Sequence, residues 1–187
     1  MKQLFLYLGV LLTFASCNKN DNLPKTVNND AEITLKVNEL YSIYGKSTES
    51  LYKVPFADSI FSPGLKKNLD EAVKASNASI ERTEKEKKGD KPQIFEGSLF
   101  TSLYEGYTNY KIVSVKMLND SGEAKAEVNV EFENSNENPK ITWVDKINLI
   151  NPGDGWKIDN IDFDDKLGNT SDLKKSLASF IEGAKTN

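Results

Sequence analysis

Acidic side chains gather near the end of the chain, at spacings that suggest calcium binding. They are Asp159, Asp162, Asp164 and Asp165. A helix–loop–helix calcium loop starting at Asp162 needs a liganding side chain at its fifth position and glycine at its sixth. Lys166 and Leu167 occupy those two positions. We therefore interpret the run as the solvated end of a strand and expect no bound metal and no other cofactor.

Catalytic chemistry is restricted by composition, because the chain contains no histidine. Histidine is the side chain that titrates near neutral pH and the commonest metal ligand. The sequence also lacks the motifs of serine nucleophiles, phosphate loops and zinc sites. A lone aspartate or glutamate whose pKa is raised by burial remains a candidate general base. The sequence thus favours a protein without catalytic activity, with an enzyme as the alternative.

Aromatic side chains are the other set that suggests a site. They fit two interpretations, the lining of a ligand pocket or a packed core, and their regular spacing favours the core. The residues concerned are Tyr41, Tyr44, Phe100, Tyr104, Tyr107, Trp143 and Trp156.

Two long helices are predicted in the first half of the chain. Apolar residues recur at helical spacing within residues 29–45, and Gly45 supplies a stop. A second helix begins at Ser62, with Pro63 in its first position, and continues into the charged segment 81–88. That segment mixes both signs of charge, which indicates a solvated helix end; a charged patch for a partner is the alternative.

The second half changes to the alternation typical of strands. A short helix is predicted over residues 98–107, before the change. A parity shift between Ile158 and Ile161 predicts a β-bulge, and Leu173 begins a closing helix. Four strands are predicted, over residues 110–118, 124–132, 141–150 and 156–163.

This order of elements predicts an α+β fold. N-terminal helices pack on a curved four-stranded antiparallel sheet, and a C-terminal helix closes the domain. Residues 30–187 suffice for one domain with its own core. The chain holds 24 basic and 28 acidic side chains, and without residues 1–16 its net charge is −5. This balance argues against nucleic acid as a partner.

Residues 1–16 have the pattern of a secretory signal. Lys2 supplies a positive start, residues 4–12 are apolar, and small residues precede Cys17. The apolar run is shorter than the roughly 18 residues that a membrane span requires. Cleavage is expected between Ser16 and Cys17. The polar residues 17–29 then form a flexible tether.

The residues around the cleavage site resemble the bacterial lipobox. Ala15 and Ser16 precede Cys17, the only cysteine of the chain, while Phe14 stands where leucine is usual. The resemblance implies a diacylglyceryl group on Cys17 and a palmitate-bearing membrane anchor, since two or more acyl chains hold stably. Asn18, in place of the inner-membrane retention aspartate, implies an outer-membrane lipoprotein that faces the periplasm, with surface exposure left open. The alternative is a plain signal peptide with a chance cysteine.

Two further resemblances concern the mature chain. The run Gly-Trp-Lys-Ile-Asp-Asn-Ile at residues 155–161 resembles the last strand of nuclear-transport-factor-like (cystatin-like) domains. Residues 30–183 resemble a family of uncharacterised bacterial lipoproteins with that fold. This implies a cone with a pocket at its wide end; the Asp–His pair of the superfamily's enzymes does not carry over to a chain without histidine. Asp58-Ser59-Ile60 resembles an O-glycosylation motif of one diderm phylum, which implies a glycan on Ser59.

The expected function is that of a membrane-anchored envelope lipoprotein. Its domain binds an envelope protein partner or a small ligand without catalysis. A histidine-free isomerase or hydrolase and a periplasmic immunity or inhibitor protein are the alternatives. A deep pocket around a buried carboxylate favours the enzyme, whereas a filled cone with an exposed apolar patch favours the other two.

Overall fold

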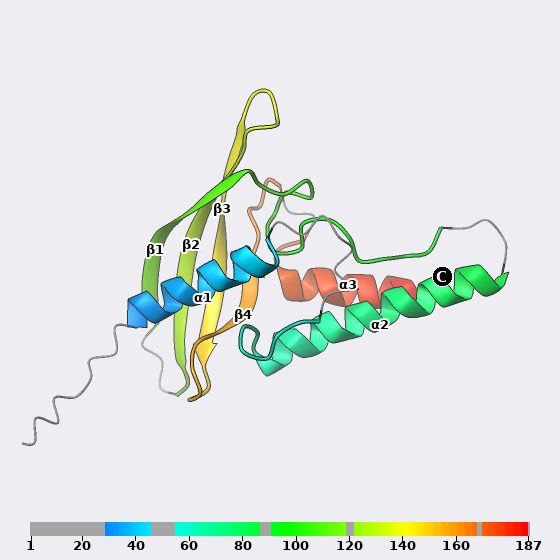
Figure 1. Cartoon of the computed structure of the whole chain (residues 1–187), viewed down its shortest axis with the longest axis horizontal. Coiled ribbons are helices and arrows are strands. Elements are labelled where there is room, and N and C mark those ends of the chain that lie inside the picture. The colour runs from blue at the N-terminus through cyan, green and yellow to red at the C-terminus, as the bar shows by residue number, and fades with distance from the viewer. Residues whose placement is uncertain (1–28, 46–54, 87–90, 119–121, 168–169, 187) are drawn as a thin grey trace, which may run out of the picture.

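The computed structural model describes residues 29–45, 55–86, 91–118, 122–167 and 170–186, which form an α+β domain (Figure 1). The helices are α1 (Asn29–Ile43), α2 (Pro63–Glu86) and α3 (Leu173–Thr186). The strands are β1 (Asn109–Leu118), β2 (Ala124–Asn134), β3 (Ile141–Asn151) and β4 (Lys157–Asp162). The predicted α+β class and antiparallel four-stranded sheet are confirmed. The expected signal peptide lies outside the described residues, and so does the expected tether except for Asn29, which is the first residue of α1.

The sheet is a meander in the order β1-β2-β3-β4, and strand parity decides its two faces. Along β2 the alternate residues Val128, Val130 and Phe132 are buried, as the sequence pattern predicts. The predicted bulge is confirmed on β4. Asn148 pairs with Asn160, but the next residue of β3 pairs with Ile158, so that Asp159 is the extra residue.

The helices form two groups (Figure 1). Helix α1 lies across the inner face of the sheet, where Tyr41 meets Phe132 at 5.2 Å between ring centroids. Helices α2 and α3 pack on each other and extend away beside β4, the strand that both contact. The start of α2 is fixed to β4, because the Ser62 N–H donates to the Ile158 carbonyl at 2.8 Å. The hydroxyl of Ser62 also accepts the Leu65 N–H at 3.1 Å and so caps α2.

The short helix predicted over residues 98–107 is wrong. That segment consists of turns and bends. The N–H of Ser102, which a helix would direct to its own backbone, donates instead to the carboxylate of Asp145 at 2.9 Å. Gly106 adopts a φ of +80°, in the left-handed region that does not continue a right-handed helix. Tertiary polar contacts therefore override the helical spacing of the apolar residues.

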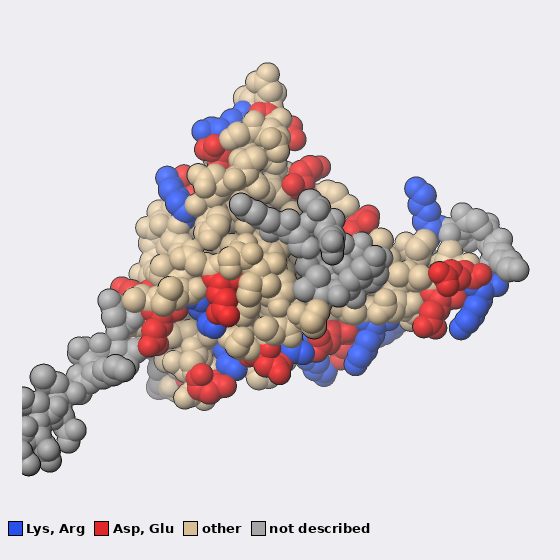
Figure 2. Space-filling view, in the orientation of Figure 1, with Lys and Arg blue, Asp and Glu red and all other residues tan. Residues whose placement is uncertain are grey.

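On the face drawn in Figure 2, charged side chains of both signs lie among uncharged ones. Figure 2 shows Lys and Arg interspersed with Asp and Glu along the exposed edges of this face. Such mixing is the ordinary surface of a solvated domain and does not by itself indicate a partner.

Candidate functional site

A buried carboxylate on β3 is the strongest chemical feature of the interior. The parity of β3 that buries Trp143, Ile147 and Leu149 also turns Asp145 inward, where its exposure is 0%. Burying an ionised carboxylate without partners costs several kcal/mol, so the fold must supply hydrogen bonds. Asp145 is not among the candidate residues named from sequence. The signal that could identify it is an aspartate at the same parity as Trp143 and Ile147 in a predicted strand.

Donors from three segments converge on Asp145. Its Oδ2 accepts the Thr101 hydroxyl at 2.9 Å, the Ser102 N–H at 2.9 Å and the Trp143 indole N–H at 3.2 Å. Its Oδ1 accepts the Ser102 hydroxyl. The Asp164 N–H is shared between the Ser102 Oγ at 2.7 Å and Asp145 Oδ1 at 3.2 Å. The carboxylate thus fixes the turns around residue 101 and the chain after β4 to the middle of the sheet.

Burial decides the electrostatics of this network. It raises the pKa of Asp145 above its ordinary value, although the hydrogen bonds from Ser102, Thr101 and Asp164 act in the opposite direction. None of the ion pairs among the described residues involves Asp145. A raised pKa suits a general acid or base. An ionised carboxylate has about four acceptor sites, however, and the chain's own donors occupy them.

An aromatic cluster fills the space beside this network. The Tyr41 ring lies 5.0 Å from that of Tyr110 and 5.8 Å from that of Tyr107 between centroids. Phe132 stacks on Trp143 at 5.5 Å. Burial, and after it the charge of Asp145, raises the pKa of Tyr41. The space between α1 and the sheet is therefore packed with rings at ordinary aromatic distances.

The aromatic residues singled out from sequence fall into three groups. Five of them are buried: Tyr41, Tyr44, Phe100, Trp143 and Trp156. Tyr107 is partly buried. Tyr104 is 56% exposed and does not join the others. Two buried polar atoms, Tyr107 Oη and Trp156 Nε1, have no hydrogen-bond partner in the described part of the chain.

A shallow groove of about 610 Å³ runs along α1 and is floored in part by Trp156. Two lysines are held within it. Lys36 Nζ donates to Glu39 at 2.6 Å and to the Ser59 carbonyl at 2.8 Å. Lys157 Nζ lies 2.9 Å from Asp154, and this contact lowers the pKa of Asp154. Ser59, the expected glycosylation residue, lies in the lining and is exposed.

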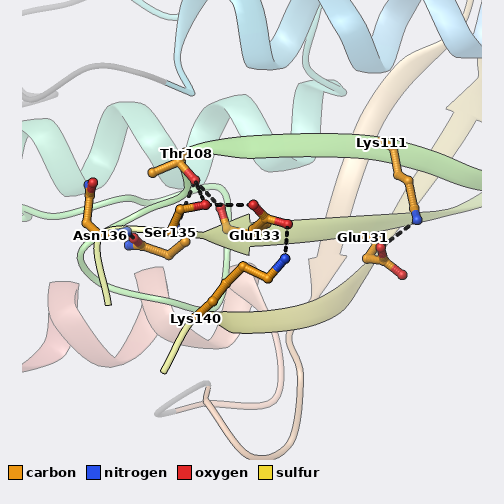
Figure 3. A network of polar contacts seen from close by, with 8 residues as sticks. Thr108, Lys111, Glu131, Glu133, Ser135, Asn136 and Lys140 are labelled. Atoms are coloured by element: carbon orange, nitrogen blue, oxygen red, sulfur yellow. Dashed lines mark hydrogen bonds and ion pairs between the residues drawn. The ribbon is translucent and has the colours of Figure 1, made fainter. Parts of the chain in front are cut away.

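A second polar network lies on the opposite, outer face of the sheet (Figure 3). Glu133 on β2 accepts the Ser135 hydroxyl at 2.6 Å and Lys140 Nζ at 2.8 Å. These contacts lower the pKa of Glu133, with Lys140 as the largest cause. Lys111 pairs with Glu131 at 2.7 Å on the same face. The network fastens the end of the β2–β3 hairpin and remains open to water.

Asp159, the first residue of the acidic run, lies within β4 and makes structural contacts. Asp159 accepts the Ser62 hydroxyl at 2.6 Å and pairs with Lys174 at 2.8 Å. Over the described residues, no group of three acidic or thiol side chains is placed to hold a metal ion. No helix within the described ranges combines the length and apolar character needed to cross a membrane. The expected lipidation and cleavage residues, Cys17 and Ser16, lie outside the described chain.

Comparison of the chain with protein-family models, curated proteins and solved structures gave no match.

Proposed function

We propose that this chain is a membrane-anchored lipoprotein of the cell envelope whose α+β domain is a non-catalytic binding or accessory module. The signal-like residues 1–16 and the lipobox-like approach to Cys17 support the anchor. An outer-membrane location facing the periplasm follows from Asn18 by resemblance. The partner is an envelope protein or a small ligand; an immunity or inhibitor protein is a special case of the same binding function.

The observation that carries the binding function is the saturation of Asp145. A general base needs a lone pair directed at the proton that it removes. Here the carboxylate accepts donors from Thr101, Ser102, Trp143 and Asp164. Packed rings occupy the neighbouring interior. Binding is accordingly assigned to the surface, where grooves lie along α1 and between α2 and α3.

A histidine-free enzyme is the second candidate, and one observation favours it. Burial raises the pKa of Asp145, which is the direction expected of a carboxyl that acts as a general acid or base. Catalysis there requires the turns around Ser102 to withdraw and free an oxygen. The cystatin-like cone is likewise a proposal. It is supported by the position of α1 across the inner face of the meander and by the bulge at Asp159.

The anchor and the module are tested together in the full chain. Wild type and Cys17→Ala are produced in a diderm bacterium, labelled with a palmitate analogue and fractionated. Label and membrane association are expected in wild type alone. Crosslinked envelopes are then searched for a protein that wild type captures and the variant does not. An unmodified Cys17 in membrane-bound wild type contradicts the anchor, and a missing partner together with turnover of a candidate substrate favours the enzyme.

A further inference from the structure

Helices α2 and α3 form a pair whose two sides differ. One side is closed by the extended segment that follows α2, which Figure 1 shows running back beside the pair. In that segment the Gln93 N–H donates to the Ser79 hydroxyl at 2.8 Å, and the Phe95 N–H donates to that of Ser76 at 3.0 Å. The Phe95 ring meets Phe180 of α3 at 4.9 Å. The segment after α2 therefore covers this side of the α2–α3 pair.

The other side of the pair is a groove of about 380 Å³. Its apolar lining consists of Ala75 and Ala78 on α2 with Ile181 and Ala184 on α3. Alanine side chains are short and leave room above the two helices, and the Arg82 guanidinium donates to the Ala184 carbonyl at 3.1 Å from α2 to α3. Ala78 is exposed, and Ala75 and Ile181 are partly exposed. Small residues at a helix contact allow a further helix to approach closely.

Basic side chains border this groove, although the mature chain as a whole is acidic. Lys74, Arg82 and Lys185 belong to the lining. The acid of the lining, Glu71, lies 3.9 Å from Lys67, and this pair is also solvent-exposed and of little strength. Lys185 is 3.7 Å from Glu182, a solvent-exposed pair of little strength. Three basic side chains against one acid leave the lining with a positive net charge, which complements carboxylates.

We propose that this groove docks an acidic amphipathic helix of a partner protein. Apolar residues of that helix lie on the alanines, and its carboxylates face the basic border, as in other helix-in-groove interfaces. The lining of α2 extends from Glu71 to Arg82, roughly 16 Å at about 1.5 Å per residue, which is enough for three turns. The proposal rests on the binding function proposed above and names its surface and the chemistry of its partner.

The test places a photo-crosslinking amino acid at Ala78 of the full-length lipidated chain in living cells. The matched control places it at Asn77, which is exposed on α2 but outside the groove lining. The expected result is an adduct from Ala78 alone, mapped by mass spectrometry to one partner peptide that is acidic and apolar at helical spacing. A peptide without that pattern, a peptide of a second copy of this chain, equal adducts at both positions, or no adduct overturns the proposal.

Charge is tested with the mapped peptide as the probe. Lys74→Glu should weaken its binding about three- to tenfold, the range expected for reversing one exposed charge. Lys116→Glu, the same change on exposed β1, should leave binding unchanged. Equal weakening by both variants points to non-specific attraction and contradicts the docking site. If crosslinked envelopes yield a partner but Ala78 forms no adduct, the docking site in the groove is contradicted and the proposed binding function stands. If neither experiment yields a partner, both proposals are contradicted.

Discussion

Two carboxylates on neighbouring strands have pKa values shifted in opposite directions, because they lie on opposite faces of one sheet. Asp145 of β3 faces inward and is fully buried, whereas Glu133 of β2 faces outward beside Lys140. Both accept several hydrogen bonds. The pKa of Asp145 is nevertheless raised, and that of Glu133 is lowered. Hydrogen bonds from neutral donors do not fully offset the free-energy cost of removing water from the ionised Asp145. At Glu133 the carboxylate stays solvated, and the nearby cation stabilises its charge.

The largest expected effect comes from removing the inner carboxylate. Asp145→Ala should lower the free energy of unfolding by roughly 2–5 kcal/mol, because each buried donor left unpaired costs about 1–3 kcal/mol. The Ser102 N–H loses the one acceptor that it has among the described residues. Urea unfolding of the full chain measures the change. A loss below about 0.5 kcal/mol would show that the network adds nothing to stability.

Asp145→Asn should have a smaller effect on stability than Asp145→Ala. Its amide oxygen still accepts the Ser102 N–H, and its NH₂ donates to the Ser102 hydroxyl oxygen where the wild type accepts. The loss should be about 1–2 kcal/mol, between those of the alanine variant and wild type. Equal losses for the asparagine and alanine variants would indicate that the charge itself, rather than the acceptors, holds the turns.

The two tryptophans differ in whether the indole N–H has a hydrogen-bond partner. The Trp143 N–H donates to Thr101 Oγ1 at 2.9 Å, whereas that of Trp156 has no partner among the described residues. Trp143→Phe should therefore destabilise more than Trp156→Phe, by about 1 kcal/mol. Thermal and urea unfolding of both variants give the difference. The reverse order would assign Trp156 a hydrogen bond that the structure does not show.

The sequence predicts most of the elements but not the polar network. Alternation along β2 and the parity shift between Ile158 and Ile161 are local patterns, and both are confirmed. The turns around Ser102 are fixed by Asp145, which is 43 residues away along the chain, so local periodicity predicts a helix there and is wrong. Parity places Asp145 inside, but it does not identify the donors, because these lie on an irregular segment. Strand pairing is readable from sequence, whereas contacts between loops depend on the assembled fold.

The pH dependence of stability should differ in sign between the two carboxylates. Folding raises the pKa of Asp145, so its protonation stabilises the fold below about pH 4, and this contribution is lost as pH rises through the folded pKa. The stability difference between wild type and Asp145→Asn should then shrink or reverse with rising pH. For Glu133 the lowered pKa gives a contribution that is present at neutral pH and lost in acid. Urea unfolding of wild type, Asp145→Asn and Glu133→Gln from pH 3 to 7 tests both signs. Parallel pH curves for the two variants would contradict them.

The smallest effect is expected from Glu133→Gln. The side chain is solvated, and its pairing with Lys140 is screened, so stability at neutral pH should barely change. Raising the salt concentration should reduce the remaining difference from wild type. A loss as large as that of Asp145→Asn would remove the distinction between the two faces.

Site-resolved titration tests the central claim, that burial makes Asp145 a structural anchor with chemistry opposite to that of Glu133. Carboxyl carbon shifts of both residues are followed by NMR over pH in one labelled sample of the full chain. The predicted result is a midpoint above 3.8 for Asp145 and below 4.5 for Glu133. An Asp145 midpoint at or below 3.8 would contradict the account, because the hydrogen bonds would then outweigh burial.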